Sequence, residues 1–231
     1  MIYPNFTLEN AHNGPVFGLD EAGRGPLAGP VVAACVHIPD DKRSLDFVGE
    51  IRDSKKLSDK MLEYLFEKIS ENFIYGIAEV SPQEIDEINI LQASLKAMEK
   101  AFSNCHPEAF TLKDLDSSGQ ALQNDRVALI DGNRIPKNLP CKAQAVVKGD
   151  GKSVSIAAAS ILAKVTRDRI MTELAAEHPH YGWERNVGYP TAEHLAAIDR
   201  FGITPHHRRS FAPVRNFIEF GKTQSQSAIA V

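Results

Sequence analysis

The sequence has few cysteines, no long apolar run and no excess of basic residues. Only three cysteines occur among 231 residues, Cys35, Cys105 and Cys141, and they form no C-x-x-C pair. This excludes a disulfide framework and a zinc ribbon, and it fits a reducing cytoplasm. No apolar run approaches the roughly 18 residues of a membrane span, and the first thirty residues include Asp20 and Glu21 rather than a basic start and an apolar stretch. We therefore expect a cytoplasmic protein with no membrane partner.

Basic residues are outnumbered overall. The chain has 26 lysines and arginines against 30 aspartates and glutamates, a formal charge of -4, which disfavours a protein that binds nucleic acid through overall basicity. The balance is uneven, because residues 1–131 carry 12 basic and 22 acidic side chains and residues 132–216 carry 13 and 7. A basic second half suits a polyanion held beside metal-binding carboxylates, and it is equally compatible with unevenly distributed solvated charge.

Apolar patterning predicts strands that alternate with helices. We expect strands over residues 16–20, 30–38, 73–80, 126–130 and 143–147. We expect helices after Ser58, from Ser81, and over residues 90–102, 154–176 and 191–201. This alternation is typical of an α/β fold with helices on the faces of a sheet. Residues 110–125 are predicted to form an inserted surface loop and residues 217–231 a flexible tail, so that residues 1–216 make up one domain.

Three predicted strands end in carboxylates. Asp20 and Glu21 follow the first strand, Asp131 follows the fourth, and Asp150 comes shortly after the fifth. A single aspartate after a strand is usually a cap or turn residue, but three such endings favour a shared site, because α/β folds bind their ligands at strand ends. Clustered carboxylates repel one another, and all-oxygen ligands favour Mg²⁺ or Mn²⁺ over Zn²⁺. The sequence therefore predicts a site for these cations.

A glycine-rich turn follows the first two acids directly. It places Arg24 between Gly23 and Gly25, and the glycines permit the bend that would bring Asp20 and Glu21 to one site. Most glycine-rich turns are simply tight turns. Here backbone N–H groups and a cation lie beside carboxylates in the sequence, which favours contact with a phosphate or a sugar hydroxyl.

Six blocks of the sequence, in this order, resemble bacterial ribonuclease HII. They are GLDEAGRGPLAGPVVA at 18–33, DSKKLS at 53–58, LIDGN at 129–133, VKGD at 147–150, AAASILAKV at 157–165 and GYPT at 188–191. The resemblance covers about residues 16–213. It implies a ribonuclease H-like α/β fold, with a central mixed β-sheet flanked by helices and a small C-terminal helical extension.

The resemblance also implies an activity. The expected substrates and partners are RNA-DNA hybrids and duplex DNA with embedded ribonucleotides, cut endonucleolytically as in ribonucleotide excision repair. Two Mg²⁺ or Mn²⁺ ions held by four acids can activate a water and stabilise the leaving oxygen, giving 5′-phosphate and 3′-hydroxyl ends. We expect the enzyme to be a monomer.

The resemblance assigns roles to particular residues. The catalytic, metal-binding acids would be Asp20, Glu21, Asp131 and Asp150. The groups that read the ribose 2′-hydroxyl and its phosphate would be Gly23, Arg24 and Gly25, and Tyr189 would pack on the sugar after the scissile phosphate. Further phosphate contacts are favoured for Lys55, Lys56 and Lys164, since the blocks that hold them match the family. For Arg167 and Arg169, phosphate contact and a solvated helix face both stay open.

The sequence leaves two alternatives to a ribonuclease: a nucleic-acid-binding module and a nuclease or phosphoesterase that acts on DNA. A non-catalytic nucleic-acid-binding module would not need strand-end acids and should be basic. A metal-dependent nuclease or phosphoesterase acting on DNA is the alternative enzyme, and the Gly-Arg-Gly turn argues against it, because only ribose offers a 2′-hydroxyl.

The paired histidines at 178, 180, 206 and 207 could ligate metal, but without neighbouring acids or cysteines they are more typical of surface or phosphate-adjacent groups. Tyr181 and Trp183 are predicted to be core or wall aromatics, and the alternative for Tyr189 is likewise a packing aromatic.

Overall fold

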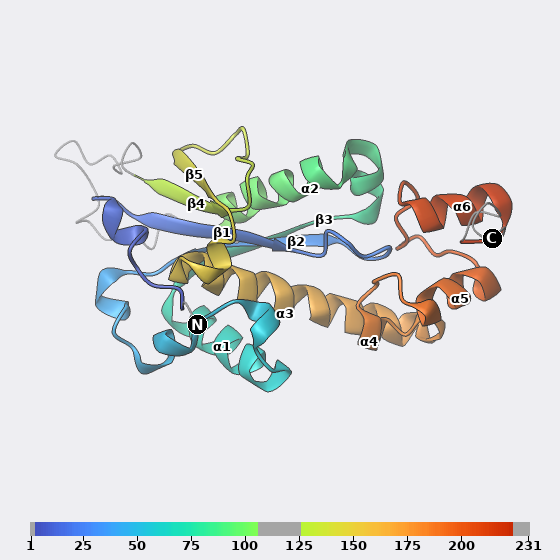
Figure 1. The fold of residues 1–231 in the computed structure, drawn as a ribbon, viewed down its shortest axis with the longest axis horizontal. Coiled ribbons are helices and arrows are strands. Elements are labelled where there is room, and N and C mark those ends of the chain that lie inside the picture. The colour runs from blue at the N-terminus through green and yellow to red at the C-terminus, as the bar shows by residue number, and fades with distance from the viewer. Residues whose placement is uncertain (1–2, 106–125, 224–231) are drawn as a thin grey trace, which may run out of the picture. The chain divides into compact units, whose positions relative to one another are not determined.

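A computed structural model describes residues 3–105 and 126–223 (Figure 1). The predicted loop at 110–125 lies outside this range. Contacts within the chain separate two compact units. The first comprises Met1–Ala22, Val32–Glu79 and Leu95–Val165, and the second comprises Gly23–Val31, Val80–Ser94 and Thr166–Val231. One catalytic domain over residues 1–216 stays a prediction.

The first unit is built on a five-stranded sheet in the order β3-β2-β1-β4-β5. The strands are β1 Val16–Ala22, β2 Val31–His37, β3 Ile74–Val80, β4 Val127–Asp131 and β5 Lys142–Val146. Strand β1 pairs antiparallel with β2 and parallel with β4, and β4 pairs parallel with β5. The sheet is therefore mixed, and each of the five predicted strands is present.

The predicted helices are also present. The longer ones are α1 Asp59–Asn72, α2 Pro82–Asn104, α3 Val154–Glu177, α5 Ala192–Phe201 and α6 Ala212–Phe220, and α4 is the single turn Trp183–Asn186. Short 3-10 turns are η1 Glu9–Ala11, η2 Asp40–Lys42, η3 Asp46–Glu50, η4 Ser54–Lys56, η8 Gly149–Gly151 and η9 Pro179–Tyr181. None of the helices in residues 3–105 and 126–223 could span a membrane.

Capping side chains set two of the helix starts. The Ser58 hydroxyl accepts a hydrogen bond from the backbone N–H of Met61 at 3.4 Å, which begins α1. Asn89 interrupts α2 with a φ of +66°, and its carboxamide oxygen accepts from the N–H of Leu91 at 3.0 Å. The two separate helix starts expected from the sequence, at Ser81 and at residue 90, thus correspond to the two halves of α2.

Helices cover both faces of the sheet (Figure 1). On one face, Val36 of β2 belongs to a buried cluster with Leu65 of α1 and Leu162 of α3. On the other face, the ring of Phe17 lies 5.1 Å from that of Phe102 of α2, centroid to centroid. Both faces of β1 and β2 are therefore buried, which explains why their sequences are apolar almost throughout.

A close approach between β1 and α3 determines where the first acid lies. A Cβ on Gly18 would come within 2.1 Å of the Ser155 carbonyl carbon, so that only glycine allows this packing. Because alternate residues of a strand share a face, Asp20 lies on the same side of β1 as Gly18. The fold thus directs Asp20 toward the side of the sheet where α3 begins.

The second unit has its own core around Trp183, which is fully buried with Tyr181, Ile198 and Val214. The prediction that Tyr181 and Trp183 are core aromatics is confirmed. The C-terminal helical extension also lies here.

The prediction of a flexible tail over residues 217–231 is wrong at its start. Helix α6 continues to Phe220, because Phe217 packs against the core of the second unit. The Thr223 backbone N–H then donates to the Asp199 carboxylate at 2.7 Å, and Thr223 is buried. The rest of the predicted tail, residues 224–231, lies outside the described range.

Candidate active site

Two neighbouring strands present acids at the same level of the sheet. The parallel register pairs Leu19 of β1 with Ile130 of β4, and the next residues along these strands are Asp20 and Asp131. Asp20 is buried, with 6% of its surface exposed, whereas Asp131 is partly exposed. The Asp131 carboxylate accepts a hydrogen bond of 2.6 Å from the Gly149 N–H, which fixes it beside η8.

The four predicted acids interact electrostatically. Burial raises the pKa of Asp20 well above its ordinary value of 3.8, and the charges of Glu21, Asp131 and Asp150 raise it further. The Glu21 N–H, 2.7 Å from the Asp20 carboxylate, partly opposes this rise in pKa. For Asp150, burial is again the largest cause of a raised pKa, followed by the charges of Asp53 and Asp131. The structure therefore brings the four acids into one mutually repulsive cluster.

A fifth acid, Asp53, was not singled out from the sequence. It contributes to the raised pKa of Asp150, and it caps η4 by accepting from the Lys55 N–H at 3.0 Å. A buried hydrogen bond of 2.7 Å between the hydroxyls of Ser54 and Ser160 fastens η4 to α3. The signal in the sequence that could have identified Asp53 is its position as the first residue of the block DSKKLS.

The three predicted lysines belong to the same unit as the acids. Lys55 and Lys56 are exposed on η4, and Lys164 is half-buried on α3. The charge of Lys55 lowers the pKa of Asp150, so this ammonium group lies near the acid cluster. Lys56 forms an ion pair with Asp53 at 3.2 Å. Positive charge therefore stands beside the carboxylates.

The Gly-Arg-Gly turn and Tyr189 belong to the second unit, and the turn follows β1 without a break in the chain. Gly23 has a φ of +93°, and a Cβ there would lie 2.0 Å from the Nε atom of Arg167. A side chain at this position would be both strained and in collision. Arg24 and Gly25 are exposed, while Pro26 and the residues after it are buried.

Two buried arginines hold this turn from its inner side. Arg208 donates hydrogen bonds to the carbonyl oxygens of Gly23, Arg24, Gly29 and Pro30, over distances of 2.7 to 3.2 Å. Arg167 donates to the carbonyl oxygens of Ala28, Pro30 and Val187, at 2.9 to 3.1 Å. These bonds fix the backbone of the turn.

Burial lowers the pKa of both guanidiniums, to about 10 for Arg167 and about 9 for Arg208, so both are cations at neutral pH. For Arg167, the alternative of a solvated helix face is wrong, because the side chain is buried and its guanidinium donates hydrogen bonds to carbonyl oxygens of the turn. Arg208 was missed in the sequence, where nothing distinguishes a buried arginine from the exposed Arg209 next to it. The two buried arginines therefore place positive charge beneath the turn.

Tyr189 is 47% exposed, and its two alternatives, a contact with the substrate sugar and a packing aromatic, both stay predictions. A Cβ on Gly25 would lie 3.1 Å from a carbon of the Tyr189 ring, which places the ring against the turn. The ring and the exposed part of the turn thus form one continuous surface of the second unit.

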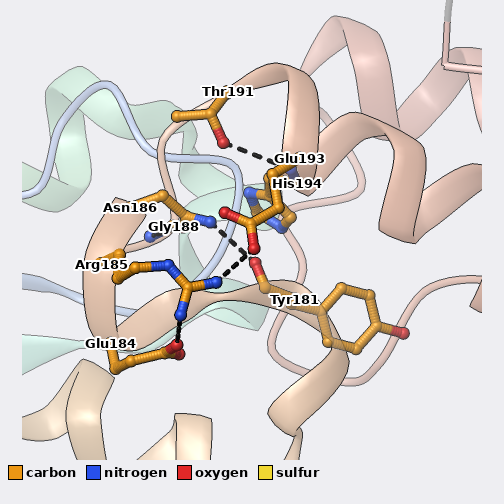
Figure 2. Close-up of polar contacts among 8 residues, drawn as sticks. All are labelled: Tyr181, Glu184, Arg185, Asn186, Gly188, Thr191, Glu193 and His194. Atoms are coloured by element: carbon orange, nitrogen blue, oxygen red, sulfur yellow. Dashed lines mark hydrogen bonds and ion pairs between the residues drawn. The ribbon is translucent and has the colours of Figure 1, made fainter.

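Hydrogen bonds hold the chain on both sides of Tyr189, and Figure 2 shows those made by Asn186 and Thr191. Before it, the Asn186 carboxamide donates to the Tyr181 carbonyl oxygen at 2.7 Å and accepts from the Gly188 N–H at 2.9 Å. After it, Thr191 caps α5 by accepting from the N–H of His194 at 3.2 Å, and the His194 ring bonds the Tyr189 carbonyl oxygen at 2.9 Å. Arg185 forms exposed ion pairs with Glu184 and Glu193 on the same surface.

The buried His194 is part of a hydrogen-bonded network. The Trp183 indole N–H donates to its Nε2 atom at 3.1 Å, which leaves Nδ1 to donate to the Tyr189 carbonyl oxygen. His207 lies 3.1 Å from the same Nε2 atom, and burial lowers the pKa of His207 to about 3. Both rings are therefore neutral parts of the support for the Tyr189 loop, and the expectation of a surface histidine is wrong for His207.

Known proteins match this chain over most of its length. The family described as Ribonuclease HII matches residues 17–214. A Ribonuclease HII from Paramagnetospirillum magneticum is 49% identical over 217 residues, which cover 94% of this chain and 100% of that protein. One from Rhodospirillum rubrum is 52% identical over 214 residues, 92% of this chain and 90% of that protein.

The fold also matches a solved structure. The crystal structure of the ribonuclease H2 from Pyrococcus horikoshii superimposes with a TM-score of 0.67 at 26% identity, covering 90% of this chain and 98% of that one. The predicted ribonuclease H-like fold class is thereby confirmed.

Proposed function

Because this chain belongs to the ribonuclease HII family, and is therefore a ribonuclease H that acts on RNA-DNA hybrids, we propose that it also cuts duplex DNA at single embedded ribonucleotides. Two divalent cations, Mg²⁺ or Mn²⁺, would be held by Asp20, Glu21, Asp131 and Asp150. The turn and Tyr189 would recognise the ribose.

The mutual repulsion of the four acids carries this proposal. Burial and the charges of Glu21 and Asp131 raise the pKa of Asp20, so the ionised cluster is unfavourable without a compensating positive charge. The donors are all carboxylate oxygens, which hard cations such as Mg²⁺ and Mn²⁺ prefer. These residues therefore fit the cations implied by the resemblance. When bound, such cations activate a water and neutralise charge that develops on the leaving oxygen of a phosphodiester.

Lysines beside the acids would bind the nucleic acid backbone. Lys55 and Lys56 are exposed, and the charge of Lys55 acts on Asp150. Together with Lys164 they would attract phosphates that the carboxylates alone would repel. Attack of water on the phosphorus with departure of the 3′ oxygen would leave a 5′-phosphate and a 3′-hydroxyl.

The turn would supply the requirement for ribose. Arg24 and Gly25 are exposed, and the buried guanidiniums of Arg167 and Arg208 add positive charge on the inner side of the turn. A phosphate beside the turn would be attracted by this charge. A 2′-hydroxyl both donates and accepts hydrogen bonds and is absent from DNA, so at least one ribonucleotide would be needed.

Three duplexes of identical sequence test the proposal: DNA with one ribonucleotide, an RNA-DNA hybrid, and DNA alone. Each is assayed with Mg²⁺, Mn²⁺ and EDTA, and the product ends are labelled. We expect the first two duplexes to be cut with either cation and DNA alone to stay intact. Cleavage of the hybrid alone would contradict the junction activity, cleavage of DNA would support a DNA nuclease, and turnover in EDTA would contradict the metal requirement.

A further inference from the structure

Two histidines and a glutamate of the second unit form a cluster separate from the four acids. Ligand atoms of Glu177, His178 and His206 all lie within 4.8 Å of one another. Glu177 and His178 stand at the C-terminal end of α3, and His206 lies two residues before Arg208. The expectation that these histidines lack a neighbouring acid is wrong, because a Glu177 carboxylate oxygen lies within 4.8 Å of a ring nitrogen of each.

The distance between the two imidazole rings is close to that of two rings on a shared metal ion. Their centroids are 5.4 Å apart, with a tilt of 58° between the ring planes. Two imidazoles on one tetrahedral zinc, with bonds of about 2.0–2.1 Å, have centroids about 5 Å apart. Neighbouring ligand atoms of such an ion are about 3.4 Å apart, and rotation of the exposed Glu177 side chain can bring its oxygen within that range.

A buried indole holds the two rings in place. The centroid of Trp183 lies 5.6 Å from that of His178 and 6.2 Å from that of His206, with both contacts nearly perpendicular. Trp183 itself is fully buried. The backbone N–H of His178 also continues the α3 hydrogen-bond pattern by donating to the Leu174 carbonyl oxygen at 2.9 Å. Glu177 and His178 therefore lie at the negative end of a long helix, which favours a cation.

We propose that Glu177, His178 and His206 form a binding site for a divalent transition metal, with Zn²⁺ as the preferred ion. Two imidazole nitrogens and one carboxylate oxygen favour Zn²⁺, Co²⁺ or Ni²⁺ over Mg²⁺. The ion ties the end of α3 to the segment that contains His206. The His206 carbonyl oxygen accepts from the Gly29 N–H at 2.9 Å, so the metal stabilises the segment that supports the Gly-Arg-Gly turn.

The chain contains a single tryptophan, Trp183, which makes the site directly observable. The full-length protein is stripped with EDTA, exchanged into buffer with excess Mg²⁺ to occupy the acid cluster, and titrated with Co²⁺ or Ni²⁺. We expect saturable quenching of Trp183 fluorescence at one equivalent, reversal of that quenching by Zn²⁺, and a rise in Tm when Zn²⁺ is added.

Ligand variants and a matched control complete the test. His206→Gln and Glu177→Gln should each weaken metal binding at least about tenfold, with Tm in EDTA unchanged. His180→Gln should bind metal like wild type, because His180 is exposed and stacks on Phe201 at 4.4 Å instead of joining the cluster. Absence of quenching, equal quenching in wild type and His206→Gln, or loss of quenching in Asp131→Asn would overturn the proposal. Cleavage in Mg²⁺ is measured separately, so a negative result for the transition-metal site does not contradict the proposed nuclease function.

Discussion

The Arg208 guanidinium donates a hydrogen bond of 2.7 Å to the carbonyl oxygen of Gly23 and another of 3.2 Å to that of Arg24. The planar guanidinium fork makes several such bonds at once, whereas a lysine presents its three donors from one nitrogen. The exposed turn is therefore shaped from its buried side by a residue that lies 185 positions after Gly23 and 184 after Arg24 in the sequence.

Arg208→Lys should damage ribose recognition more than general ribonuclease activity. Carbonyl oxygens left without donors should cost about 1–3 kcal/mol of unfolding free energy, visible as a lower Tm. Cleavage at a single embedded ribonucleotide should fall more than about tenfold in kcat/KM, and cleavage of a long RNA-DNA hybrid should fall less, because each hybrid offers many registers. The matched control is Arg209→Lys, which changes the exposed neighbour. Equal losses in the two variants would contradict the positioning role of Arg208.

Asp131→Asn should abolish cleavage while the fold remains intact. A neutral amide binds cations weakly, yet its oxygen can still accept the hydrogen bond from the Gly149 N–H. Removing one charge from the repulsive cluster should leave the free energy of unfolding of the metal-free protein unchanged or raise it by about 1 kcal/mol. The Tm in EDTA should then equal or exceed that of wild type. Thermal denaturation in EDTA and turnover at saturating Mg²⁺ test both parts. Asp41→Asn, on the exposed η2 turn, is the control, and unchanged turnover in Asp131→Asn would refute its role as a metal ligand.

In the metal-free protein, the contribution of Asp20 to the free energy of unfolding should fall as pH rises above about 4. The pKa of Asp20 is raised in the folded protein, so the folded state binds a proton more tightly than the unfolded chain does. That stabilisation is complete below the unfolded pKa of 3.8 and is lost as pH rises through the higher, folded value. Denaturation in EDTA across this range should show a smaller fall for Asp20→Asn than for wild type, and Mg²⁺ should reduce the fall in wild type. Identical pH profiles for the two proteins would contradict a raised pKa at Asp20.

Lys164 should contribute one phosphate contact. Substrate binding should weaken steeply with salt, and Lys164→Ala should make the log-log salt dependence shallower by about one unit. Lys60→Ala, which removes an exposed lysine from α1, should leave the slope at the wild-type value. Binding is measured in Ca²⁺ or with Asp131→Asn to prevent turnover. A wild-type slope for Lys164→Ala would mean that this side chain contacts no phosphate.

The sequence predicted the helices and strands of the fold better than it predicted the buried arginines that hydrogen-bond to the Gly-Arg-Gly turn. Apolar periodicity and capping residues are local signals, so β1 and the start of α1 could be located from a few neighbouring residues. The burial of Arg167 and Arg208 depends on carbonyl groups that the fold brings to them from distant positions. No local pattern encodes that pairing. The continuation of α6 to Phe220 was missed for the same reason, since the packing of Phe217 on the second core decides it.

Tyr189 offers the most specific test of substrate recognition. The ring is 47% exposed and lies against Gly25, and the loop that carries it is fixed by Asn186 and Thr191. Since Tyr189 lies outside the buried core, Tyr189→Ala should change Tm only slightly. If the ring packs on the deoxyribose after the scissile phosphate, a 2′-hydroxyl at that sugar would clash, and the enzyme would favour the RNA-to-DNA junction.

Two substitutions separate this contact from a hydrogen bond of the phenol. Tyr189→Ala should lower cleavage at a single embedded ribonucleotide by about 10–100-fold, in line with about 1–3 kcal/mol for the loss of an aromatic stacking contact. Tyr189→Phe keeps the ring face and should retain most activity. Tyr64→Ala, at a surface tyrosine of α1 with 44% exposure, is the matched control. The measurement is kcat/KM on the junction duplex and on an all-RNA strand paired with DNA. A junction loss no larger than the all-RNA loss would mean that Tyr189 does not read the sugar, because a stacking contact with deoxyribose must act on the junction selectively.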